Sequence, residues 1–85
     1  IYYTAGNGEC DFLVQEGPRI VSAIQVCYRI DDENRSREIR GLTASLKRFR
    51  ISEGLLLTYD QEDEIEVEGK KILIKPVWKW ILESK

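Results

Sequence analysis

Polar side chains interrupt two apolar runs in the first third of the chain, and these are the residue types best suited to chemistry. Glu9 and Asp11 lie in the first run, and Gln25 lies between Ile24 and Val26 in the second. Carboxylate and amide oxygens are the ligands that hard divalent cations take from proteins. The sequence therefore points to these two runs as a candidate site.

Both runs are typical of β-strands that form an antiparallel hairpin. Residues 9–16 and 19–29 are rich in apolar and β-branched side chains, and a Gly-Pro pair separates them. A connection this short favours antiparallel pairing. A preceding strand is expected to end near residue 4, before the turn-forming residues 5–8.

The register of this hairpin follows from the positions of its apolar residues. Even-numbered positions carry most of them in both strands, so the apolar faces coincide only if even residues oppose even residues. The loop must then contain an odd number of residues. On this register Asp11 opposes Gln25 and Glu9 opposes Cys27, all on one face. Cys10 lies on the other face, so no disulfide with Cys27 is expected.

A helix is predicted at about residues 33–50. Apolar side chains recur there at spacings of three and four residues, which gives a single stripe facing a sheet. The stripe consists of Ile39, Leu42, Leu46 and Phe49. The other face carries one acid, Glu38, and the six cations Arg35, Arg37, Arg40, Lys47, Arg48 and Arg50.

Two interpretations of this basic face stay open. The cations could contact the phosphates of a nucleic acid, with Arg37, Arg40 and Lys47 as the candidate residues. Such a face is more often solvated, or paired with acids such as those at residues 31–33. The net charge of −2 argues against a basic surface over the whole domain.

The second half of the chain predicts a buried strand and a hairpin. Residues 54–59 begin with Gly and continue as an apolar run without alternation, which indicates a strand covered on both faces in the middle of an α/β sheet. Apolar and charged residues then alternate over residues 65–74 around a central Gly, which favours a half-exposed hairpin.

A short closing helix is expected after this hairpin. Pro76 suits its first turn, and one side of the helix can pack through Val77, Trp78, Ile81 and Leu82. Trp78 and Trp80 diverge by about 200° on a helix, so one of them is expected to be half exposed. The aromatic residues near both ends could stack bases, pack, or form a docking surface.

Composition limits the classes of protein. With 85 residues, 42% of them hydrophobic and 33% charged, the chain is expected to fold as one soluble domain with a single core. Two Cys and no His exclude a zinc site of the Cys/His type and favour a reducing cytoplasm. No run approaches the roughly 20 apolar residues of a membrane helix. The absence of Met predicts that the chain is a fragment of a longer polypeptide.

The expected order of strand, acidic strand, strand, helix and buried strand resembles the restriction-endonuclease-like, PD-(D/E)XK core. In that superfamily an Asp on one strand and a D/E-x-K on the next converge on a divalent metal. Here Glu9-Cys-Asp11 resembles the first motif, and Gln25-Val-Cys27 stands in the place of the second. The resemblance implies an α/β fold whose mixed sheet contains an antiparallel hairpin, with one long helix and a short C-terminal helix.

A narrower resemblance covers nearly the whole chain. The linear order of its motifs is similar to the C-terminal domain of unknown function in a family of prokaryotic AAA+ ATPases. The motifs are Gly8-Glu9-x-Asp11-Phe12, Ile24-Gln25-Val26-Cys27-Tyr28, Arg35-Ser36-Arg37-Glu38-Ile39-Arg40, Gly54-Leu55-Leu56-Leu57-Thr58-Tyr59-Asp60, Ile65-Glu66-Val67 and Pro76-Val77-Trp78-Lys79-Trp80. The resemblance implies that residues 1–85 are one nuclease-like domain, with the upstream ATPase domain of the same polypeptide as partner. No Walker A sequence occurs, so ATP chemistry would belong to upstream residues.

The resemblance also implies the site residues. Asp11, Gln25 and Glu9 would be ligands of Mg²⁺ or Mn²⁺, and Asp11, Gln25 and Cys27 stand at the catalytic positions. Two positions depart from the family pattern, because Gln25 brings no negative charge and the Cys27 thiol cannot stabilise developing charge as an ammonium does. The alternative is that Asp11 and Gln25 hydrogen-bond each other or nearby backbone, with Cys27 a small core residue.

These departures decide the expected function. The favoured one is an accessory, non-catalytic nuclease-fold module that serves interaction or nucleic-acid engagement while the ATPase supplies the energy. The first alternative is a metal-dependent DNA endonuclease with a degenerate site. The second is a structural oligomerisation domain.

Overall fold

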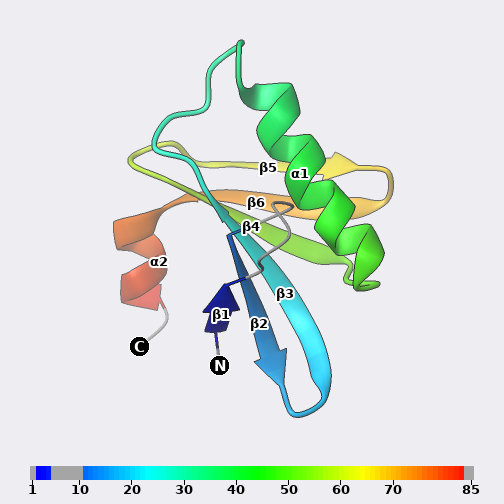
Figure 1. Ribbon diagram of the computed structural model, residues 1–85. Coiled ribbons are helices and arrows are strands. Elements are labelled where there is room, and N and C mark those ends of the chain that lie inside the picture. Colours follow the sequence, from blue (N-terminus) through cyan, green and yellow to red (C-terminus); the bar gives the residue numbers. More distant parts are fainter. Residues whose placement is uncertain (1, 5–10, 84–85) are drawn as a thin grey trace.

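The computed structural model describes residues 2–4 and 11–83, which form one sheet and two helices (Figure 1). The elements are β1 (Tyr2–Thr4), β2 (Phe12–Glu16), β3 (Arg19–Val26), α1 (Arg35–Arg48), β4 (Glu53–Thr58), β5 (Asp63–Val67), β6 (Lys70–Pro76) and α2 (Val77–Glu83). In the described part of the chain, no helix is both long and apolar enough to cross a membrane.

The sheet is mixed. Its six strands lie in the order β1-β2-β3-β4-β6-β5. β1 to β3 form antiparallel pairs, β4 is parallel to both β3 and β6, and β5 closes the other edge antiparallel to β6. The predicted α/β class, mixed sheet, antiparallel hairpin and two helices are confirmed. The central position of β4 lets a helix cover each of its faces, α1 at Gly54 and α2 at Leu57, which explains its uninterrupted apolar run.

α1 packs on one face of the sheet through the predicted stripe. Leu42 and Leu46 are fully buried, and Ile39 and Phe49 pack against the same core. The approach is close: a Cβ placed on Gly54 of β4 would lie 3.0 Å from Leu46 Cδ2, which explains the Gly at the start of that strand. The helix begins two residues later and ends two residues earlier than predicted.

A left-handed residue ends α1. Arg50 has a φ of 57°, the backbone N–H of Ile51 bonds to the carbonyl of Leu46, and the N–H of Arg50 bonds to the carbonyl of Lys47. This is a Schellman arrangement, which satisfies the last helical carbonyls. Ile51 is buried in the core, so the helix end is anchored as well as capped.

The hairpin register is confirmed over most of β2, but the loop prediction is wrong. Phe12 pairs with Ile24 and Val14 pairs with Ser22, so even residues oppose even residues. A β-bulge then shifts the register, and Glu16 pairs with Arg19 across a loop of two residues. Even-to-even pairing requires one residue more than the two in the loop. The bulge inside the strands takes up that residue, because a bulge changes the parity of pairing without lengthening the turn.

The main core lies on the odd-numbered face of this hairpin. Leu13 and Ala23 are buried beneath α1, whereas the even-numbered Phe12 and Val26 are 39% and 47% exposed. α2 covers part of the even face, where Trp80 lines a small apolar cavity with Phe12, Ile24 and Leu57. Parity establishes which residues share a face, but it does not tell which face the long helix covers.

α2 begins directly after Pro76, the last residue of β6. Trp78 is 56% exposed, which confirms that one tryptophan faces solvent. The expectation that the other apolar residues of this helix pack is wrong: Val77, Ile81 and Leu82 are 38%, 50% and 61% exposed. The reason is that α2 rests on the sheet through the opposite side, which carries Trp80.

Candidate functional site

Asp11 is held against the neighbouring strand. Its Oδ2 accepts a hydrogen bond of 2.8 Å from the backbone N–H of Val26, just before β2 begins. This contact agrees with the expected position of Asp11 beside Gln25. Glu9 and Cys10 lie outside the described residues, so their expected positions relative to Cys27 stay predictions.

Gln25 points to α1 and not to Asp11. Its Nε2 donates a hydrogen bond of 2.9 Å to Glu38 Oε1, and the Glu38 side chain is only 14% exposed. Arg37 Nε lies 3.5 Å from the other Glu38 oxygen. Glu38 is thus a site residue that the sequence reasoning counted only as the single acid of a basic face. One signal was present: Glu38 lies four residues before Leu42 and therefore borders the buried stripe.

The side-chain oxygen of Gln25 makes no hydrogen bond with the described residues. This atom, Oε1, is buried. An amide oxygen in this state could accept a proton donor or a cation. No cluster of three or more His, Cys, Asp or Glu side chains able to hold a metal occurs in the part of the chain that the structure describes.

Cys27 behaves as a small core residue. It is half-buried, packs against the core, and its thiol donates to the carbonyl of Arg29 at 3.3 Å. Asn34 Nδ2 contacts the sulfur at 3.7 Å. Burial first, and then the negative charges of Glu38 and Asp31, raise the pKa of the Cys27 thiol. A neutral thiol results, which supplies neither a cation nor a nucleophile at neutral pH.

Of the three residues proposed to contact nucleic acid, only two line the same groove. Arg40 and Lys47 line a groove between α1 and the β5–β6 turn, whereas Arg37 does not. Lys47 makes an ion pair with Glu68 of that turn and not with the acids at the start of α1. Arg37 is 77% exposed, beside Glu38.

An apolar stripe, formed by Val77, Trp78, Ile81 and Leu82, covers the outer side of α2. A separate pair of exposed aromatic residues is formed by Tyr28 and Tyr59, whose rings lie 5.1 Å apart. The backbone N–H of Tyr59 bonds to the carbonyl of Tyr28. Contiguous exposed apolar side chains of this kind are typical of interaction surfaces.

A relative from an archaeon matches nearly the whole chain. The chain is 34% identical over 87 residues to the uncharacterized protein MJ1544 of Methanocaldococcus jannaschii. The aligned segment covers 95% of the chain but only 19% of that relative, so the chain spans about a fifth of the length of the protein it matches. No family model matches the chain, and no solved structure matches it.

Proposed function

We propose that this chain is an accessory, non-catalytic module with a restriction-endonuclease-like core, situated at the C-terminus of an AAA+ ATPase and serving interaction. The observation that carries the proposal is that Asp11 and Gln25, at the motif positions, are engaged in hydrogen bonds within the fold. The element order β1-β2-β3-α1-β4 supports the fold assignment, because it is the order on which the family resemblance depends.

The chemistry of the motif positions argues against cleavage. Metal-dependent hydrolysis needs a cation held by carboxylates, and a group that activates water or stabilises developing charge. Asp11 supplies one carboxylate, whose Oδ2 is already bound to backbone. Gln25 is neutral, and burial raises the pKa of the Cys27 thiol, which disfavours the thiolate. These features favour a site that has lost its hydrolytic function.

The apolar stripe on α2 supports the interaction role. Its four side chains face away from the sheet, so they contribute little to the core of this domain. The relative from M. jannaschii carries the matching segment within a chain about five times as long. We propose the upstream ATPase domain as the partner that covers the stripe, with nucleic-acid engagement by α1 as a second route of interaction.

Metal binding tests the non-catalytic assignment. Titration of Mg²⁺ and Mn²⁺ into the protein, followed by calorimetry, is expected to give no binding heat with either the wild type or Asp11→Ala. Supercoiled plasmid is expected to stay uncut. The matched control is Asp60→Ala, which removes one exposed acid elsewhere. Binding that is lost in Asp11→Ala but kept in Asp60→Ala would overturn the assignment.

A DNA endonuclease with a degenerate site is the second candidate, and the unpartnered Gln25 Oε1 is the observation that favours it. On this alternative, the amide oxygen and the free oxygen of Asp11 would be ligands of Mg²⁺ or Mn²⁺. Plasmid nicking that requires both Asp11 and Gln25 would establish it.

A further inference from the structure

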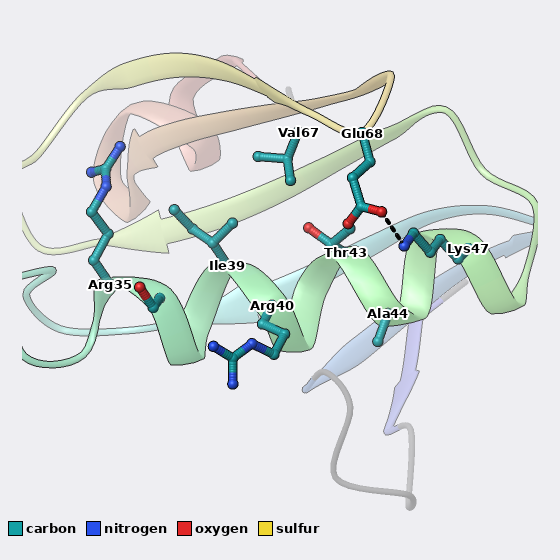
Figure 2. A pocket seen from close by; sticks show the side chains of 9 residues that line it. Arg35, Ile39, Arg40, Thr43, Ala44, Lys47, Val67 and Glu68 are labelled. Atoms are coloured by element: carbon teal, nitrogen blue, oxygen red, sulfur yellow. Dashed lines mark hydrogen bonds and ion pairs between the residues drawn. The ribbon is translucent and has the colours of Figure 1, made fainter.

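A groove of about 420 Å³ lies between α1 and the β5–β6 turn, apart from the motif hairpin (Figure 2). Its volume falls in the range of small-molecule sites. Its lining comes from two elements far apart in the sequence, which meet only in the folded chain. The lining residues used below are Arg35, Ser36, Ile39, Arg40, Thr43 and Val67.

Two of the cations that line the groove have no ion-pair partner in the described part of the chain. Arg35 and Arg40 are exposed, and neither forms an ion pair within the described residues. Figure 2 shows Arg35 at one end of the groove and the Lys47–Glu68 pair at the other. A guanidinium without an internal partner keeps its full set of donors, and its planar fork matches the oxygens of a phosphate.

The end marked by Arg35 is also the start of α1, where the N–H of Arg35 bonds to the carbonyl of Asp31 but the cap residue makes no side-chain cap hydrogen bond. The side chain of the cap residue, Asn34, is used elsewhere: Oδ1 accepts from the N–H of Asp31, and Nδ2 donates to the carbonyl of Arg29. The backbone N–H groups of Ser36 and Arg37 therefore have no acceptor in the described chain. Free N–H groups at a helix start attract anions.

The middle of the groove is apolar. Ile39 of α1 and Val67 of β5 point toward each other across it, and both are half-buried (Figure 2). Beside them, Thr43 is 3% exposed and its hydroxyl has no hydrogen-bond partner among the described residues. An apolar wall with a nearby unused hydroxyl suits a flat heterocycle with polar edges.

We propose that this groove binds a nucleotide unit, with phosphate oxygens at Arg35, Arg40 and Ser36 and the base against Ile39 and Val67. The unit is either a free nucleotide or one residue of a single strand. The inference deepens the nucleic-acid route of the proposed function. It adds Arg35 and Ser36 to the residues that the sequence suggested, and it leaves Arg37 outside the site.

Calorimetry with four probes tests the site: ADP, adenosine, inorganic pyrophosphate and a thymidine hexanucleotide. ADP is expected to bind more tightly than pyrophosphate, and adenosine is not expected to bind measurably. Arg35→Ala or Arg40→Ala weakens binding by about tenfold, because each removes a charge-assisted contact. Arg37→Ala is the matched control, since it removes the same charge from the same helix outside the groove. It is expected to leave the affinity unchanged.

The probes also distinguish the source of the ligand. If a strand is the ligand, the hexanucleotide binds more tightly than ADP, and log affinity falls with log salt by about 0.7 for each neutralised phosphate. If a free nucleotide is the ligand, ADP binds more tightly than the hexanucleotide. Absence of binding by both, or equal losses in Arg35→Ala and Arg37→Ala, would overturn the proposal. Either of these results leaves the non-catalytic assignment standing, because that depends on the metal titration.

Discussion

The β2–β3 hairpin and the groove beside α1 both carry polar side chains, but the fold uses them differently. At the hairpin, Asp11 and Gln25 are bound to a backbone N–H and to Glu38. At the groove, Arg35 and Arg40 have no ion-pair partner among the described residues. Residue type suggested the hairpin as the site. The hairpin keeps one buried atom, Gln25 Oε1, that is unpaired within the described chain, whereas the groove offers two exposed guanidinium groups.

The largest effect is expected from Glu38, which connects the hairpin to α1. Glu38→Ala leaves the half-buried amide of Gln25 without its acceptor and is expected to lower the free energy of unfolding by about 1–3 kcal/mol. Urea denaturation measures this loss. Nucleotide affinity in the groove is expected to be unchanged, because Glu38 does not line it.

Glu38→Gln is the control for this prediction, since its side-chain oxygen can still accept the Gln25 hydrogen bond. It is expected to lose less stability than Glu38→Ala. Equal stability of Glu38→Ala and the wild type would mean that the hairpin groups are not engaged as the structure indicates, and the contrast with the groove would disappear.

A smaller effect is expected at Cys27. Its thiol pKa is raised by burial first and by the Glu38 charge next, so the folded state favours the neutral thiol. The contribution to stability is present below the unfolded pKa of about 8.5 and is lost as pH rises through the folded pKa. Alkylation rates against pH, in a Cys10→Ser background, should give a midpoint above that of an unfolded chain.

Glu38→Gln sharpens this measurement. Removal of its negative charge is expected to move the Cys27 midpoint downward, while burial keeps part of the shift. A midpoint at or below that of a short peptide thiol would instead indicate an activated cysteine, and would reopen the catalytic interpretation of the hairpin.

The smallest effect on stability is expected on the outer side of α2. Trp78→Ser should change the free energy of unfolding by less than about 0.5 kcal/mol, because this side chain is largely exposed. Trp80→Ser, which removes the side chain facing Phe12 and Leu57, should cost more. Sedimentation adds a second readout: a dimer of the wild type that dissociates in Trp78→Ser would favour the oligomerisation domain over an ATPase partner.

Much of the fold was predictable from short-range patterns. The 3.6-residue period of Leu42 and Leu46 predicts α1, and the unbroken run in β4 predicts a central strand, because both depend on which faces of an element are buried. The even-to-even pairing of Phe12 with Ile24 was also predictable from the positions of the apolar residues. These features require no knowledge of distant segments.

The roles of the polar residues required the folded chain. Glu38 lies 13 residues beyond Gln25, and Val67 lies 28 residues beyond Ile39, so no local pattern relates the members of either pair. The sequence also could not predict which face of the sheet α1 covers. Phe12 and Leu13 lie on opposite faces, and both faces are apolar. Spacing along the chain specifies the elements and their buried sides. Hydrogen-bond partners are fixed by packing between elements, and that packing left Arg35 and Arg40 without an ion-pair partner among residues 2–4 and 11–83.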